Sequence, residues 1–63
     1  MTITKTSAHS GITRTLDLDV TAEELTRWID GELIQNAMPR LGADEREFLK
    51  TGITAEEWEE IFA

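Results

Sequence analysis

The feature that most constrains the fold is a helix-start signal that occurs twice, in Val20–Leu25 and again in Ile53–Trp58. In each copy, a threonine hydroxyl can accept a hydrogen bond from the backbone N–H three residues later, and the glutamate there can reach back to the threonine N–H. The apolar residue before each threonine can pack against the apolar residue that ends the segment. The sequence therefore predicts that one helix begins at Thr21 and another at Thr54.

Residues 1–20 have the pattern of a β-hairpin, with β-branched residues on both sides of a turn-like segment, Ala8–Gly11. The first strand has Ile3 as its apolar residue, and we expect an edge strand or a loose arm there. In the second strand, apolar and polar residues alternate, which predicts one buried face. The apolar residues of that face are Ile12, Leu16, Leu18 and Val20.

Residues 21–63 have apolar residues at helical spacing and predict three or four short helices. Gly31 and Pro39 interrupt the pattern, whereas Gly42 and Gly52 are suited to begin and to end a helix between them. The expected inward-facing residues are, helix by helix, Leu25, Trp28 and Ile29, then Leu33, Ile34, Ala37 and Met38 in a segment over 32–38, then Phe48 and Leu49, and finally Trp58, Ile61 and Phe62. Helices this short are not stable alone, so tertiary packing must hold them.

The predicted fold class is therefore α+β, with an N-terminal two-stranded β-hairpin packed on a cluster of three or four short helices. We expect a single small domain over 1–63, with a hairpin or arm over 1–20 and a helical part over 21–63. A chain of this size buries about 60% of the surface of its unfolded form, which limits its stability. The absence of cysteine excludes disulfides and thiolate metal sites.

The charge is unevenly distributed along the chain. Residues 1–20 contain as many basic as acidic side chains, so the net charge of −7 lies in residues 21–63. Such a surface repels nucleic-acid phosphates and anionic lipids and attracts basic partners. Neither a membrane-spanning apolar run nor a secretory signal is recognisable, and we expect no membrane partner and a cytoplasmic location.

Few residues are candidates for catalysis or metal binding. His9 has Ser7 and Ser10 nearby in sequence, but all three lie in a turn that we expect to be exposed to solvent. Asp17 and Asp19 alternate as on the solvent face of a strand, and a metal ion would need further oxygen ligands. The glutamates at the helix starts are explained by capping and solvation. We therefore predict no enzyme activity, no catalytic residue, no cofactor and no metal.

An acidic surface on the last two helices has the sharpest functional interpretation. It could imitate a phosphate backbone and occupy the basic groove of a nucleic-acid-handling enzyme, or it could be an ordinary solvated face. Direct nucleic-acid binding by these two helices is excluded by their charge. Two large aromatic residues of the last helix could anchor an interface. The predicted partner-binding residues are Asp44, Glu45, Glu47, Glu56, Glu57, Glu59, Glu60, Trp58 and Phe62.

The segments Gly31–Pro39 and Asp44–Trp58 resemble small uncharacterised proteins of tailless single-stranded DNA phages (microviruses) and related prophages. The resemblance covers the chain from about residue 10 to its end. The family pattern has a serine or threonine where this chain has Gly42, and a proline where it has Ala55. Both departures keep the helix starts intact. The resemblance implies a viral accessory protein made in the cytoplasm of a bacterial host, and it brings no enzyme activity or cofactor.

Three functional hypotheses follow from these observations. The first is a small acidic protein that docks on a host or viral protein with a basic surface. The second is a DNA-mimic inhibitor of a nucleic-acid-handling or defence enzyme. The third is a minor structural or assembly component of a phage particle, with a possible homodimer through an open strand edge at residues 2–7. Arg27, Arg40 and Arg46 are expected to pair with neighbouring carboxylates of the same chain.

Overall fold

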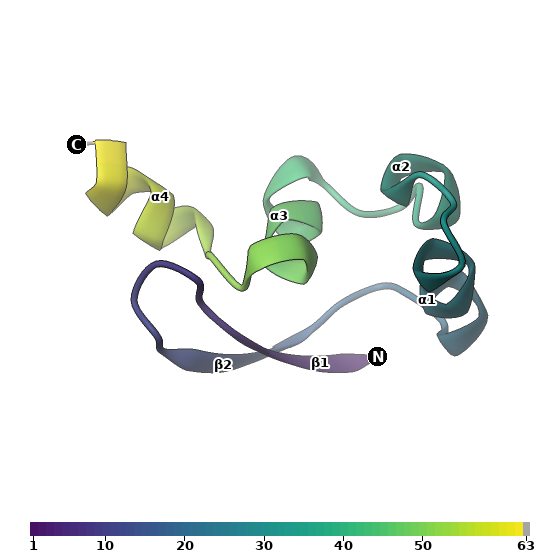
Figure 1. Ribbon diagram of the computed structural model, residues 1–63, viewed down its shortest axis with the longest axis horizontal. Helices are drawn as coiled ribbons and strands as arrows, with labels where there is room; N and C mark the ends of the chain where they lie inside the picture. Colours follow the sequence, from purple (N-terminus) through teal and green to yellow (C-terminus); the bar gives the residue numbers. More distant parts are fainter. Residues whose placement is uncertain (63) are drawn as a thin grey trace.

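The computed structural model describes residues 1–62, and Ala63, the last residue of the predicted domain, lies outside this range. The fold class is α+β, as predicted, because an N-terminal hairpin is followed by four short helices (Figure 1). Along the long axis, α4 lies at one end above the hairpin turn, α3 lies in the middle, and α1 and α2 lie one above the other at the opposite end (Figure 1). The elements are β1 (Thr2–Thr6), β2 (Thr13–Asp17), α1 (Ala22–Ile29), α2 (Ile34–Ala37), α3 (Ala43–Thr51) and α4 (Ala55–Phe62).

The hairpin is antiparallel and pairs Thr4 with Thr15 and Thr6 with Thr13. On its solvent face the threonine hydroxyls meet across the strands, at 2.8 Å between Thr4 and Thr15 and 2.9 Å between Thr6 and Thr13. Ile3 lies on the opposite face and packs against the core. The first strand is therefore a paired strand, not a loose arm.

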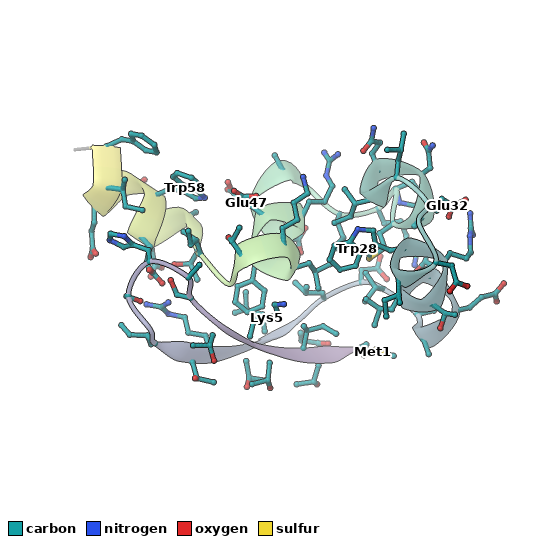
Figure 2. All side chains as sticks on the ribbon, viewed as in Figure 1. Met1, Lys5, Trp28, Glu32, Glu47 and Trp58 are labelled. Atoms are coloured by element: carbon teal, nitrogen blue, oxygen red, sulfur yellow. The ribbon has the colours of Figure 1, made fainter. Side chains whose placement is uncertain are left out.

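The core lies between the end of the hairpin and the first three helices. Its two largest fully buried side chains are Phe48 of α3 and Met38, which directly follows α2. Leu25 and Trp28 of α1 are half-buried and pack against it, and Trp28 points toward the centre of the molecule (Figure 2). The buried cluster comprises Leu18, Val20, Ile34, Ala37, Met38, Leu41, Phe48 and Leu49.

Five apolar residues that were predicted to face inward are exposed, and one of them is Phe62 of α4, which is 75% exposed. Leu16 is 36% and Ile12 50% exposed, because the buried face of the second strand is formed by the residues that follow it, Leu18 and Val20. Ile29 is 79% exposed at the C-terminal end of α1. Leu33 is 60% exposed because the second helix begins after it, at Ile34, and not at residue 32 as predicted.

The starts of α1 and α3 agree with the local signals in the sequence. At α1, the Glu24 carboxylate accepts from the Thr21 N–H at 2.9 Å, and the Thr21 hydroxyl accepts from the Glu24 N–H at 3.1 Å. At α3, the Glu45 carboxylate accepts from the Gly42 N–H at 3.0 Å. Each bond satisfies a backbone donor that the first helical turn leaves without a partner.

The C-terminal end of α3 is fixed against the end of β1. Gly52 ends the helix with a φ of 76°, in the left-handed region that glycine favours. A Cβ at this position would lie 2.4 Å from the Thr6 carbonyl oxygen, so only glycine allows the approach. Next to this contact, the Ala8 N–H donates to the Thr51 carbonyl at 2.9 Å. This junction brings α4, which follows directly, over the hairpin turn.

Candidate interaction surface

The acidic residues of α3 and α4 differ in their exposure. Asp44, Glu56, Glu59 and Glu60 are exposed, whereas Glu45 and Glu47 are half-buried. Helix α4 alone therefore presents three exposed carboxylates and contains no basic residue. This part of the predicted surface is available to a partner.

Glu57 is a correction to the predicted surface, because its side chain is buried, with 3% of it exposed. Its carboxylate accepts a hydrogen bond from the Ser7 hydroxyl at 2.8 Å and forms a salt bridge with Arg14. The Glu57 carboxylate therefore does not cap the start of α4. Only the other half of the predicted helix-start signal is present, in which the Thr54 hydroxyl accepts from the Glu57 N–H at 3.3 Å.

Ser7 is the centre of this buried polar cluster. Its hydroxyl accepts from the His9 N–H at 3.1 Å and from the Ser10 N–H at 3.2 Å while it donates to Glu57. The hairpin turn therefore wraps around the serine, and the serine connects the turn to α4. Sequence reasoning missed this role because 50 positions separate Ser7 from Glu57. His9 itself is exposed.

The cluster holds Glu57 in its ionised form. Burial raises the pKa of this carboxyl group, but the hydrogen bonds from Ser7, Arg14 and Ser10 and the positive charge of Arg14 together lower the pKa below its usual value. A buried carboxylate with an arginine and hydroxyl donors is a structural group, because its lone pairs are already occupied. We therefore assign Glu57 to the attachment of α4 and remove it from the partner-binding set.

Two aromatic side chains of α4 form an exposed stack. The rings of Trp58 and Phe62 are parallel within 6° and their centroids are 5.1 Å apart. Phe62 is 75% exposed and Trp58 is half-buried, and neither belongs to the core cluster. Figure 2 places Trp58 on the side of α4 that faces away from the hairpin. By helical spacing, Glu59 lies next to this stack, whereas the exposed Glu56 and Glu60 lie on the other side of α4. We call these five exposed or half-buried residues together the acidic-aromatic face of α4.

A second polar cluster lies at the opposite end of the molecule. Arg40 pairs with Glu24 at 2.6 Å and with Asp19 at 3.0 Å. The backbone hydrogen bond from Thr21 and the nearby Arg40 lower the pKa of Glu24, although burial opposes them. Arg27 pairs with Glu32 at 2.7 Å. The predicted intramolecular pairing is thus confirmed for Arg27 and Arg40.

Arg46 departs from that prediction, because no carboxylate within the described residues pairs with it and its guanidinium donates to the Gly42 carbonyl at 3.4 Å. Arg46 and Lys50 border a shallow, open hollow of about 210 Å³ between α2 and α3. Its other lining residues are Ile34, Gln35, Ala43 and Glu47. The hollow has no buried charged group and is too open to enclose a small ligand.

Asp17 and Asp19, the candidate metal pair, are engaged separately, with the N-terminal amine at 3.3 Å and with Arg40 at 3.0 Å. Over residues 1–62, no group of three or more histidine and carboxylate side chains is arranged to hold a metal ion. Within the same range, no helix combines the length and the apolarity needed to cross a bilayer.

No protein-family model, curated protein or solved structure matches this chain. The resemblance to microvirus proteins therefore stays a prediction.

Proposed function

We propose that this chain is a small acidic protein-binding protein without enzyme activity, a viral accessory factor that acts in the cytoplasm of its host. It docks on a host or viral protein with a basic surface. The observation that carries the proposal is the acidic-aromatic face of α4, where a partly exposed aromatic stack and three exposed carboxylates lie on one short helix.

The two kinds of residue on this face contribute differently to binding. Carboxylates attract a basic partner over a distance of about one Debye length and so increase the rate of encounter. Aromatic side chains bury a large area at a low cost in conformational entropy, and they are the residues that most often dominate interface energies. Phe62 has no role in the core, so its exposure leaves it free to enter a pocket on the partner.

A DNA-mimic inhibitor is the second candidate. The favouring observation is a further exposed carboxylate, Asp44, in the first turn of α3, which adds to the three on α4. A mimic needs an extended array of negative charge, and its target is the groove of a nucleic-acid-binding enzyme. This version differs from the first because duplex DNA should compete with the protein for its target.

The test is a pull-down from bacterial lysate with three baits, the wild type and two double variants of equal net charge. Glu59→Lys/Glu60→Lys changes the acidic-aromatic face, and the control Glu23→Lys/Asp30→Lys changes exposed acidic positions on and after α1. We expect a protein that the wild type and the control retain at low salt and release at high salt, and that the α4 variant fails to retain.

The aromatic contribution is tested with Phe62→Ala, which should weaken capture of the same protein without changing the salt dependence of the remaining binding. Elution of the captured protein by duplex DNA would select the mimic over simple docking. Equal retention by the two charge variants would overturn the assignment of the site to α4, and capture of nothing above background at low salt would overturn both candidates.

A further inference from the structure

The outer edge of β2 has free backbone hydrogen-bonding groups. The Leu18 N–H donates to the Met1 carbonyl at 2.9 Å, and the Ser7 N–H donates to the Ile12 carbonyl at 2.8 Å. Hydrogen-bonded pairs alternate with non-hydrogen-bonded pairs along an antiparallel ladder. These two bonds therefore determine which residues of the hairpin direct their backbone groups toward the other strand and which direct them outward. It follows that the N–H and C=O groups of Thr13, Thr15 and Asp17 point away from β1.

The corresponding edge of β1 is partly covered. By the same alternation, the carbonyl of Thr6 points away from β2, and Gly52 lies directly against this oxygen. The Ala8 N–H, just beyond β1, is bonded to the Thr51 carbonyl. The end of α3 therefore blocks the C-terminal part of the β1 edge. The sheet of the described residues contains only β1 and β2, so the outer edge of β2 is unpaired.

β2 has two charged side chains, Arg14 and Asp17, and Arg14 is paired with Glu57 of the same chain. Natural edge strands avoid association with proline, lysine, bulges or a covering element. The strand Thr13–Asp17 contains no proline, glycine or lysine, and two of its five residues are β-branched threonines, which favour strand pairing. Thr13, Thr15 and Asp17 are all exposed.

The side-chain order of β2 selects a second copy of this chain as the occupant, because two such strands pair antiparallel about Thr15 without placing like charges opposite each other. The hairpin region, residues 1–20, has no net side-chain charge, and the remainder carries −7. Two copies repel each other least when their net-neutral hairpin regions meet. Trp58 of α4 lies on the side of the helix that faces away from the hairpin and stays free in such an arrangement (Figure 2).

We propose that the β2 edge pairs with the same edge of a second copy, antiparallel about Thr15, to give a four-stranded sheet in the order β1–β2–β2–β1. In this register Thr13 lies opposite the second copy's Asp17, so that a hydroxyl donor meets a carboxylate. Arg14 lies opposite the second copy's Leu16, which is 36% exposed in one chain, and covers it with its aliphatic stem. No like charges lie directly opposite each other.

Two proline variants test this interface. Thr15→Pro removes an outward N–H from the β2 edge, and Thr4→Pro removes one from the β1 edge. Each loses the same Thr4–Thr15 hydroxyl contact, and neither removes a hydrogen bond between the two strands. The two variants are therefore matched in their effect on the single chain.

We expect the mass from sedimentation equilibrium to rise from 7.1 kDa toward twice that value with concentration in the wild type and in Thr4→Pro, but not in Thr15→Pro. Association should strengthen with added salt, which screens the repulsion between copies. Hydrogen exchange should slow at the amides of Thr13, Thr15 and Asp17 in the associated form. A wild-type mass that stays at 7.1 kDa up to about 1 mM overturns the proposal, as does dissociation by Thr4→Pro alone.

Discussion

Gly52 combines two constraints at a single residue. Its φ of 76° is left-handed, and its backbone lies against the Thr6 carbonyl, where a Cβ would come within 2.4 Å. Gly11, in the hairpin turn, has nearly the same φ, 77°, but has nothing within 4 Å of a Cβ. Substitutions at the two glycines therefore allow the energetic cost of the left-handed conformation to be measured separately from the cost of the close contact.

Alanine substitutions at these glycines should differ in stability. We expect Gly11→Ala to lose about 1 kcal/mol through backbone strain alone. Gly52→Ala should lose at least about twice that amount, because the end of α3 must also move away from β1. Urea unfolding followed by tryptophan fluorescence measures both losses. Equal losses would show that the junction between α3 and β1 contributes no constraint of its own.

At the scale of elements, the start of α1 and both ends of α3 were predictable because their signals are local. The Thr21–Glu24 pair, Gly42 with Glu45, and the left-handed Gly52 act within three or four residues of one another, so the sequence is sufficient to identify them. Burial was less predictable. Ile29 and Leu33 have the right spacing for a buried stripe, but they lie where α1 ends and just before α2 begins. Helical spacing no longer predicts which side chains are buried once the helix has ended.

At the candidate site too, features that depend on nearby residues were predictable, and features that depend on distant residues were not. Exposure of the α4 carboxylates followed from their spacing, except at Glu57, which has the same local sequence as Glu24. Helix α4 lies over the hairpin turn, so Ser7 and Arg14 reach Glu57 from 50 and 43 positions away in the chain. No local pattern contains that contact, and only the tertiary arrangement distinguishes the two glutamates.

The two threonine caps should therefore differ in their contribution to stability. Thr21→Ala removes one half of a reciprocal box on a helix that packs against the core, and we expect it to lower the free energy of unfolding by about 1–2 kcal/mol. Thr54→Ala removes a single bond at 3.3 Å on a helix outside the core cluster, and it should lower that free energy by less than about 0.5 kcal/mol.

Thermal unfolding monitored by circular dichroism, with the wild type as reference, compares the two caps. A larger loss for Thr54→Ala would mean that α4 belongs to the same cooperative unit as the core.

At the scale of the whole molecule, the apolar core and the acidic-aromatic face lie at different places along a shape of 34 × 19 × 18 Å. The core cluster contains residues from the hairpin end through α3, and none from the described part of α4. The buried polar cluster of Ser7, Arg14 and Glu57 joins α4 to the hairpin turn. A helix held by a few polar contacts opens more readily than one held by a core, because less apolar surface is exposed.

We expect α4 to open separately from the rest of the protein and to do so more readily in acid. The folded-state pKa of Glu57 is lowered, so the stabilisation that its ionised carboxylate gives to α4 is complete above the unfolded-state pKa of about 4.3 and is lost as pH falls through the folded-state pKa.

Amide hydrogen exchange at neutral pH should show lower protection in α4 than in α3, and Ser7→Ala or Glu57→Gln should reduce protection in α4 alone. In a pH titration by NMR, the α4 amide shifts should follow Glu57 in the wild type and lose that transition in Glu57→Gln. Equal loss of protection in α3 and α4 would contradict this view, because it would make the polar cluster part of one cooperative unit with the core.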